Sequence, residues 1–448
     1  MTTTTALPRY ASTGDRAADD GAKPIRFAFE PGFSGLRCSA CGTPAESGAR
    51  FACARCFGPL EPIYDYERAA RTLTRDALAE RGSSIWRWAE LLPVESPPAP
   101  ALAVGGSPLV EAPRLAREIG VRRAWVKDDS RNPTLSFKDR VVGVAAARAH
   151  EFGFTTLACA STGNLAAAVA AAAARYGLQA VVFVPSDLEP AKTAQAAALG
   201  ATVVPIDAPY DAVNRLCLEL TDELPDWAVL NVKLRPYYAE GSKTIGFEVV
   251  EQLGWRAPDV IVGPIASGSM FTKIAQGVEE LARVGLIEPA ATRFVGGQAS
   301  GCGPVAAAFA SGGPIEPVEQ PTTIVRSLAI GTPSDGERAI TVARQSGGSI
   351  EGNDDAAVLD AVRLLATTEG ILTEPAGGVT VAALRSAVAA GRVTADDEAV
   401  LVISGNGLKT LDALPSAERA PILPASFDAF IEWWEHEAAQ PRAASSGS

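Results

Sequence analysis

Four short segments place a lysine, glycines and small polar residues at the ends of apolar, strand-like runs. Backbone N–H groups exposed where a helix begins bind phosphate or carboxylate groups, and small residues let such amides approach a phosphate closely. Taken singly, Lys138 fits a surface lysine better than a site residue, and the Ser161 and Gly263 segments can be an ordinary N-cap and an ordinary strand-helix turn. Together and in this order they predict a site for a phosphorylated cofactor. The segments are Asn132-Pro133-Thr134-Leu135-Ser136-Phe137-Lys138-Asp139-Arg140, Ser161-Thr162-Gly163-Asn164, Gly263-Pro264-Ile265-Ala266-Ser267-Gly268-Ser269-Met270 and Ser404-Gly405-Asn406-Gly407-Leu408-Lys409.

Histidine is nearly absent, and this narrows the chemistry of the site. The chain has two histidines: His150 in a helix-like stretch and His436 in a charged C-terminal segment. Both are expected at the surface, so we do not expect a Ser-His-Asp hydrolase or a histidine-rich catalytic metal site. If the chain is an enzyme, another side chain must then move protons.

The elements that position these segments alternate between strands and helices. The strand-like runs are apolar without polar alternation, and the helix-like runs between them end at glycines, which is typical of parallel sheets covered on both faces. In such sheets ligands bind at the carboxyl ends of the strands. We expect strands at 124–127, 156–160, 180–184, 202–206, 229–232, 260–262, 294–295 and 400–403, and helices at 66–80, 165–176 and 188–199.

Four of the seven cysteines form a compact module near the N-terminus. Cys38 and Cys41, and then Cys53 and Cys56, are two C-x-x-C pairs separated by eleven residues. Such a spacing lets four thiolates surround one zinc ion in a closed, structural site. Four reduced thiols without a metal are the alternative. The other cysteines, Cys159, Cys217 and Cys302, are expected to be small buried apolar residues.

Composition and charge indicate a globular protein of two or three domains. The chain has 448 residues, 47% of them hydrophobic, and a formal net charge of -12. A chain this acidic is poorly suited to nucleic acid or to an anionic membrane surface. No apolar run is long enough to span a membrane, and the first 31 residues show no signal-peptide pattern. We therefore expect a cytoplasmic homodimer that acts on a small molecule.

These motifs resemble the threonine synthase family, which belongs to the tryptophan-synthase-β-like (fold type II) pyridoxal-phosphate (PLP) enzymes. The resemblance runs from about Arg37 to Asp412 and includes the cysteine module. It is carried by the lysine segment 132–140 and by 161–164, and also by the runs 84–89, 235–244, 329–331 and 374–376. The run 84–89 (Ser-Ile-Trp-Arg-Trp-Ala) is typical of a bacterial subgroup.

The resemblance implies an α/β fold with two doubly wound domains and a small zinc-ribbon-like module. We expect a flexible arm at 1–35, the module at 36–62 and a tail at 429–448. The large PLP-binding domain is expected to combine 63–135 with 241–428, and the small domain to span 136–240.

The resemblance also implies a role for each segment. Lys138 holds PLP as a Schiff base, Phe137 packs beside the cofactor ring, and Asn164 bonds the cofactor's 3′-oxygen. Ser404 faces the pyridine nitrogen, where a neutral hydroxyl leaves the nitrogen unprotonated. Ala266, Ser267, Gly268, Ser269 and Met270 hold the cofactor phosphate, while Ser161, Thr162 and Gly163 bind the substrate carboxylate. For the substrate phosphate the candidates are Lys233, Arg235 and Lys243.

The implied reaction converts O-phospho-L-homoserine and water to L-threonine and phosphate. The sequence departs from the family's usual pattern at Lys233, Thr332, Ser404, Asn406 and in the loop 266–270. These departures leave open a relative that performs replacement or elimination on another activated amino acid, in the manner of a cysteate synthase or a dehydratase. A catalytically silent binding protein is a third alternative, and the presence of Lys138 argues against it.

Overall fold

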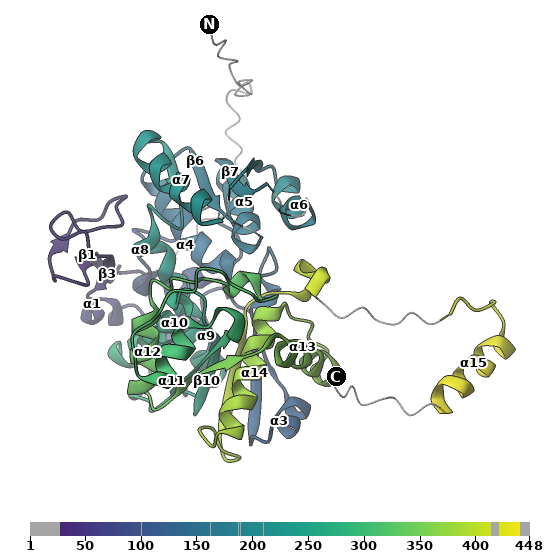
Figure 1. Cartoon of the computed structure of the whole chain (residues 1–448). Helices are drawn as coiled ribbons and strands as arrows, with labels where there is room; N and C mark the ends of the chain where they lie inside the picture. Colours follow the sequence, from purple (N-terminus) through teal and green to yellow (C-terminus); the bar gives the residue numbers. More distant parts are fainter. Residues whose placement is uncertain are drawn as a thin grey trace, which may run out of the picture.

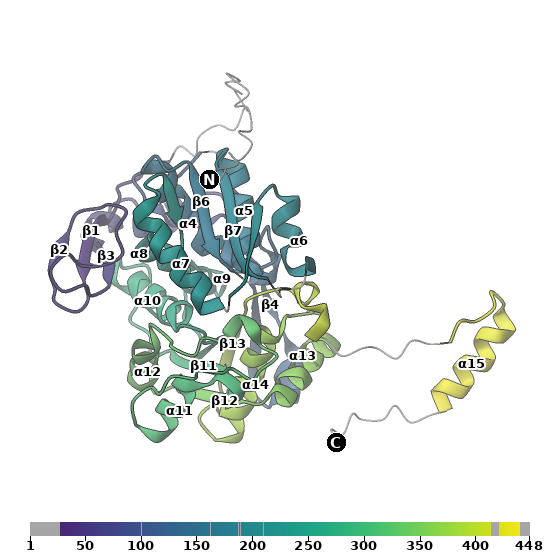
Figure 2. The same ribbon diagram turned by 45° about the horizontal axis from the view of Figure 1, so that its top comes forward.

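The computed structural model describes residues 27–99, 101–161, 163–186, 188, 190–208, 210–413 and 421–439. Two α/β domains, each built around its own sheet, lie one above the other, and the N-terminal cysteine module lies at their side (Figures 1 and 2). The predicted fold class of two doubly wound α/β domains is thereby confirmed.

The larger sheet has six strands and holds three of the four candidate segments at its strand ends. All neighbouring strands are parallel except the edge strand β4, which pairs antiparallel with β5. Every residue of β10 and β13 is buried, as expected for strands covered on both faces. In sheet order the strands are β12 (Ser349–Asn353), β11 (Arg293–Ala299), β10 (Val260–Pro264), β13 (Glu398–Ile403), β5 (Arg123–Asp128) and β4 (Leu109–Glu111).

Helices cover both faces of the larger sheet, and alternate strand residues point to each face. Ile261 and Val400 pack on one side, whereas Val262 and Leu401 pack on the other. The first side carries α9 (Lys243–Gln252), α10 (Ser269–Arg283), α11 (Pro304–Ser311) and α12 (Gly336–Gln345). The second carries α3 (Pro113–Ile119), α13 (Asp355–Glu369) and α14 (Pro375–Ala389).

The smaller sheet has four parallel strands in the order β8 (Thr202–Ile206), β7 (Gln179–Pro185), β6 (Thr156–Ala160), β9 (Trp227–Val229). One face packs on α4 (Lys138–Glu151), α5 (Asn164–Tyr176) and α8 (Arg235–Glu240), and the other on α7 (Tyr210–Glu223). Helix α6 (Pro190–Ala198) lies next to α5. Helix α5 ends where it was expected to, because Gly177 takes a left-handed conformation with φ of 67°.

The N-terminal region is a three-stranded antiparallel sheet followed by short helices. Its strands are β1 (Phe33–Cys38), β2 (Pro44–Ala45) and β3 (Leu60–Tyr64). The single helix predicted over 66–80 is wrong: α1 (Tyr66–Ala70) and α2 (Arg75–Ala79) are separate. The Thr74 side chain accepts a hydrogen bond from the Ala77 amide and so starts a second helix.

Other expected elements differ at their ends. The chain turns at Val229, whose carbonyl accepts from the amides of Val232 and Lys233, so the strand predicted to reach 232 ends earlier. Strand β12 was not predicted because its sequence, Ser-Ile-Glu-Gly-Asn, lacks an apolar run. Short 3₁₀ turns are η1 (Ile85–Leu91), η2 (Asp129–Arg131), η3 (Ser300–Cys302), η4 (Arg326–Leu328), η5 (Gly407–Lys409) and η6 (Leu411–Ala413).

The segment expected as a tail is in large part a helix. Helix α15 (Phe427–Ala439) is drawn apart from the two domains in both views (Figures 1 and 2). Its Phe430 and Trp434 rings stack with their centroids 6.1 Å apart. Across the described ranges of the chain, the helices are too short or too polar to cross a lipid bilayer.

Candidate active site

Lys138 is the first residue of α4 and lies where the two domains meet. Its amine is 4.6 Å from the centre of the Phe137 ring and 5.8 Å from that of Tyr238. Burial lowers the pKa of Lys138 from 10.5 to about 8, and the nearby Glu374 carboxylate opposes this shift. An amine with such a pKa is partly neutral at physiological pH, as a nucleophile or a proton acceptor requires.

Backbone hydrogen bonds tie the lysine segment to the loop after β13. The Phe137 amide donates to the Ser404 carbonyl at 2.9 Å, and the Asn406 amide donates to the Leu135 carbonyl at 3.0 Å. The Glu374 amide in turn donates to the Gly405 carbonyl at 3.1 Å. Three segments far apart in sequence are thereby joined, and Ser404 is fixed beside the lysine.

The side chains of Asn164 and Ser404 meet at the carboxyl group of Glu374. The Asn164 amide donates to Oε2 of Glu374 at 2.9 Å, and the Ser404 hydroxyl donates to Oε1 at 3.3 Å. Glu374 is 3% exposed, and burial raises its pKa, while Asn164, Lys409, Ser404 and Lys138 act against the rise. The structure thus brings together two of the predicted cofactor-binding side chains.

The loop between β6 and α5 is held by its own serine. Ser161 Oγ accepts hydrogen bonds from the amides of Gly163 and Ala166, each at 3.1 Å. Its hydroxyl therefore orders the start of α5, which brings the loop amides to the strand end. Thr162 lies outside the described residues.

The predicted phosphate loop, Ala266 to Met270, leads from β10 into α10. The first amides of a helix have no partner within the helix and can bind an anion. Gly268 has φ of 96°, and a Cβ atom there would lie 2.6 Å from the Asp335 carbonyl oxygen, so the position requires glycine. The Asp335 amide donates to the Ser267 carbonyl at 2.8 Å and holds the loop in place.

The three cations expected near the substrate phosphate are not together. Arg235 donates to Ser334 at 2.6 Å and to Asp335 at 2.7 Å, next to the phosphate loop. Lys233 instead donates to the Thr221 carbonyl at 3.0 Å. Of the three cations, Arg235 contacts Ser334 and Asp335, and Asp335 is bonded to the phosphate loop.

Lys243 belongs to a separate buried cluster. Its ammonium lies 2.7 Å from Glu240 and 3.0 Å from Glu280, and it is 3.8 Å from the centre of the Tyr64 ring. Lys243 is 0% exposed. Its charge is thus neutralised inside the protein, and the structure gives it a role in packing rather than at the substrate.

Arg140 is a structural residue. It is fully buried and bonds Asp129 at 2.6 Å and Glu248 at 2.6 Å. Lys127 donates to the same Glu248 at 2.6 Å. This ion network supports the base of the segment that carries Lys138.

Further polar contacts hold the segment that carries Lys138. Thr134 donates through its amide and its hydroxyl to Asp139, whose pKa burial raises to about 6. Lys409 donates to the Thr134 carbonyl at 2.7 Å and to Gln195 at 2.9 Å. Because Gln195 lies on α6, this lysine links the loop after β13 to the smaller domain.

The described residues fit PLP. Ser136, two positions before the lysine, is 0% exposed, and its hydroxyl has no hydrogen-bond partner within the described part of the chain. Such an orphaned group is rare inside proteins and indicates a missing polar partner. The desolvated lysine matches the aldehyde of PLP. The aromatic neighbour and the two polar side chains match its ring, and the helix N-terminus with its obligatory glycine matches its phosphate.

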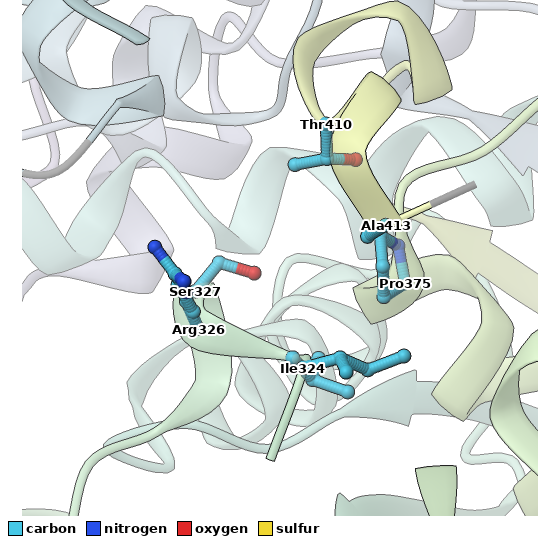
Figure 3. A pocket seen from close by; sticks show the side chains of 7 residues that line it. Ile324, Arg326, Ser327, Pro375, Thr410 and Ala413 are labelled. Atoms are coloured by element: carbon cyan, nitrogen blue, oxygen red, sulfur yellow. The ribbon is translucent and has the colours of Figure 1, made fainter. Parts of the chain in front are cut away.

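A small pocket lies beside Pro375, the residue that follows Glu374. It has a volume of about 30 Å³ and is lined by Ile324, Val325, Arg326, Ser327, Pro375, Thr410 and Ala413. Figure 3 shows Thr410 on one side and Arg326 with Ser327 on another. A space of this size suits water molecules rather than a cofactor.

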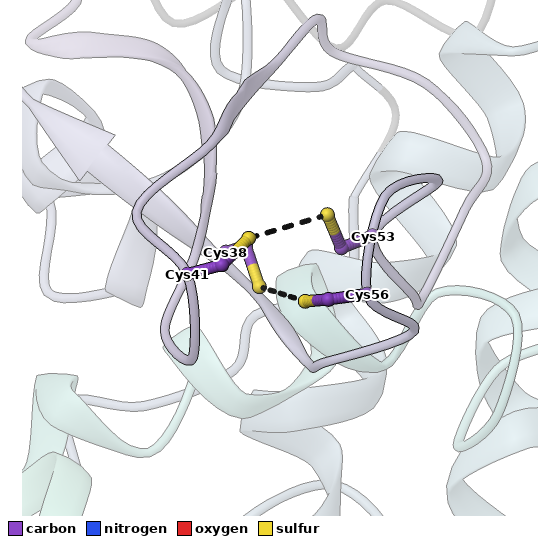
Figure 4. A group of neighbouring side chains, drawn as sticks. All are labelled: Cys38, Cys41, Cys53 and Cys56. Atoms are coloured by element: carbon purple, nitrogen blue, oxygen red, sulfur yellow. Dashed lines mark hydrogen bonds between the residues drawn. The ribbon is translucent and has the colours of Figure 1, made fainter.

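The four module cysteines converge. Their sulfur atoms all lie within 4.8 Å of one another, with Cys38 to Cys56 at 3.5 Å and Cys41 to Cys53 at 3.8 Å (Figure 4). The Arg55 amide donates to the Cys53 sulfur at 3.3 Å and the Gly58 amide to the Cys56 sulfur at 3.4 Å. Amide donors of this kind stabilise negative charge on sulfur.

Glu374 is the site residue to which the sequence reasoning gave no role. It lies in the run 374–376 that carries the family resemblance, and it precedes Pro375, the first residue of α14. A glutamate before Pro375 reads locally as an N-cap position. Its contacts with Asn164 and Ser404 span 210 and 30 residues, and no local pattern reveals them.

Comparison with known proteins agrees with this geometry. Residues 101–405 match the model of the pyridoxal-phosphate dependent enzyme family. A threonine synthase from Methanosarcina acetivorans is 36% identical over 89% of this chain and 98% of its own length. One from Methanocaldococcus jannaschii is 34% identical over 86% and 95%, and one from Halalkalibacterium halodurans is 36% identical over 78% and 98%.

Solved structures share the fold at lower identity. Maize serine racemase superimposes with a TM-score of 0.57 at 20% identity, covering 74% of this chain and 93% of that one. The processed form of threonine deaminase isoform 2 from Solanum lycopersicum gives a TM-score of 0.56 at 19% identity over 75% and 84%. On the family match and the three synthases, the chain belongs to the pyridoxal-phosphate dependent enzymes and, within them, to the threonine synthase family.

Proposed function

We propose that the protein is a PLP-dependent threonine synthase that converts O-phospho-L-homoserine and water to L-threonine and phosphate. The observation that carries the proposal is Lys138, a desolvated amine placed beside Ser404 and near Glu374 by the joined backbone segments. Relatives named threonine synthase match it at 34–36% identity over nearly their whole length.

The cofactor would be held by Lys138, Asn164, Ser404 and the loop 266–270. When bound, PLP supplies an electron sink for the electrons left at a carbon that loses a proton. The reacting proton is taken and returned by the amine of Lys138, whose pKa of about 8 lets it do both near neutral pH. The Phe137 and Tyr238 rings near this amine limit its contact with water.

The substrate's two anionic ends would be bound by different elements. The amides of the loop ordered by Ser161 suit the carboxylate. The planar guanidinium of Arg235 presents several N–H donors, which suit the phosphate group that leaves the substrate. It would exchange its contacts with Ser334 and Asp335 for the substrate's oxygens.

The decisive experiment supplies purified protein with O-phospho-L-homoserine and measures phosphate and amino-acid product. We expect equimolar threonine and phosphate, and no turnover by Lys138→Ala. A PLP-loaded protein that releases neither product refutes this reaction. Turnover of another β- or γ-activated amino acid would then identify the relative with altered substrate.

We also propose that the four cysteines hold a structural zinc ion. The closeness of their sulfur atoms and the amide donors to Cys53 and Cys56 support it. Metal analysis of the purified protein is expected to give one zinc per chain, and none after Cys38→Ser and Cys53→Ser are combined. The absence of zinc from freshly prepared wild-type protein would contradict it.

A homodimer and a cytoplasmic location stay predictions. Sedimentation at several protein concentrations tests the first, and cell fractionation tests the second.

A further inference from the structure

The guanidinium of Arg235, proposed above to bind the substrate's phosphate, is already paired with a carboxylate. Oδ2 of Asp335 accepts from Nη2 of Arg235 at 2.7 Å, and the Ser334 hydroxyl accepts from the same nitrogen at 2.6 Å. The side chains of Arg235 and Asp335 are 38% and 23% exposed, so a ligand from solution can reach the pair. A phosphate group that binds Arg235 must therefore displace the Asp335 carboxylate.

Asp335 directly precedes α12 but does not cap it. An aspartate in this place normally accepts from an amide of the first helical turn, as Asp354 does before α13 from the Ala357 amide at 2.8 Å. Within the described part of the chain, the Asp335 side chain makes no such capping bond. Its backbone has φ of -113° and ψ of 17°, outside the extended conformation that is typical of a cap. The carboxylate is thus directed at Arg235 instead of the helix.

The backbone of Asp335 is held independently of its side chain. Its amide donates to the Ser267 carbonyl at 2.8 Å, and its carbonyl accepts from the Ala339 amide at 2.9 Å. These bonds tie Asp335 to the loop 266–270 and to α12 through main-chain atoms alone. A change confined to the Asp335 carboxylate therefore leaves the loop in place.

The charge of Arg235 acts close to the reacting amine. Burial raises the pKa of Tyr238, Cys159 adds to the rise, and the positive charge of Arg235 opposes it. The centre of the Tyr238 ring is 5.8 Å from the amine of Lys138. Arg235 and Lys138 thus both interact with one tyrosine, which places the Arg235–Asp335 pair beside the proposed substrate site.

We propose that Asp335 is a built-in competitor of phosphate at Arg235, which keeps the affinity for phosphate low and so speeds the release of that product. The inference rests on the proposed role of Arg235 in binding the substrate's phosphate. Phosphate binds only the fraction of molecules in which Arg235 is not paired with Asp335, and the apparent Kd rises accordingly. The substrate has further contacts at its carboxylate and amine, whereas free phosphate has none of them.

The test is calorimetric titration of inorganic phosphate into the PLP-loaded enzyme, in which the loop 266–270 is occupied. We expect Asp335→Asn to bind phosphate about fivefold more tightly than wild type, the factor that a partly exposed ion pair contributes. Asp335→Glu restores the carboxylate and is expected to return the affinity toward that of wild type. Asp354→Asn, which changes a capping aspartate at the start of α13, is the matched control and keeps the wild-type affinity.

A second variant shows whether Asp335 acts through Arg235. In an Arg235→Gln background, Asp335→Asn should bind phosphate no more tightly than Arg235→Gln alone, because the competitor has lost its target. A gain in affinity that persists there overturns the inference, since Asp335 would then act by charge repulsion.

Unchanged phosphate affinity in Asp335→Asn also overturns the inference and leaves the pair as a structural link. If that variant does not fold, Asp335→Ser decides in the same way. During turnover we expect Asp335→Asn to lower KM and kcat together, because the product phosphate leaves more slowly. An unchanged kcat contradicts the effect on release.

The outcome is separable from that of the proposed reaction, because phosphate binding needs no turnover. Tighter phosphate binding by Asp335→Asn without threonine formation keeps the competitor and removes the reaction. Threonine formation with unchanged phosphate binding does the reverse.

Discussion

The amine of Lys138 is expected to react with an aldehyde at a lower pH than an exposed lysine does. Burial lowers its pKa from 10.5 to about 8, and only the neutral amine attacks a carbonyl. The rate at which PLP-free apoprotein takes up PLP should therefore rise as the pH increases through about 8 and level off above it. Stopped-flow absorbance of the forming imine measures this rate. A rate that still climbs steeply beyond about pH 10, the ordinary lysine range, would show an unperturbed amine.

Arg235 and Lys243 are close in sequence, but we expect substitution of Arg235 to reduce activity and substitution of Lys243 to reduce stability. Arg235→Gln removes a half-exposed donor beside the phosphate loop. We expect kcat/KM for the phosphorylated substrate to fall about tenfold to a hundredfold, the range for a hydrogen bond to a charged group. The midpoint of urea unfolding should stay near that of wild type.

Lys243→Met should instead destabilise the fold. It leaves the carboxylates of Glu240 and Glu280 buried with less positive charge. Removing one partner of a buried ion pair costs about 3–5 kcal/mol. Urea unfolding measures the loss, and a variant as stable as wild type would contradict the buried cluster.

At the scale of elements, the phosphate site depends on how β10 turns into α10. Gly268→Ala puts a side chain on a left-handed residue and within 2.6 Å of the Asp335 carbonyl oxygen. We expect the Kd for PLP to rise about tenfold or more, since strain of this kind costs about 1–3 kcal/mol. Gly254→Ala, a left-handed glycine with no atom within 4 Å of its Cβ position, is the matched control. Fluorescence titration of apoprotein with PLP compares the two.

Much of this arrangement could be predicted from the sequence, because the apolar strands and the glycine-ended helices are locally encoded. Strands 156–160 and 202–206 were predicted to the residue. The sequence could not show that Lys243 is buried, since Glu280 lies 37 residues away and faces it only after α9 and α10 pack. The contacts of Glu374 were missed for the same reason, because they form where the loops after β6 and β13 meet the start of α14.

At the scale of the whole molecule, the cysteine module is bonded to the domains behind it. Tyr64 of β3 donates to Glu240 of α8 at 2.7 Å, and the Gly48 amide donates to the Tyr237 hydroxyl at 3.0 Å. Removing the proposed zinc with a chelator should therefore lower the melting temperature of the entire protein. Calorimetry with and without chelator tests this. A chelated protein that melts as before would show that the module is independent.

Lys138 also lies at the connection between the two domains. The residues before it are bonded to the loop after β13 of the larger sheet, whereas the helix that it starts packs in the smaller domain. A body that rotates moves least at its pivot. If the smaller domain rotates when substrate binds, Asn164 moves with that domain, while Lys138 keeps its position beside Ser404. Lys138 would then lie on the rotation axis of the smaller domain and would itself move little.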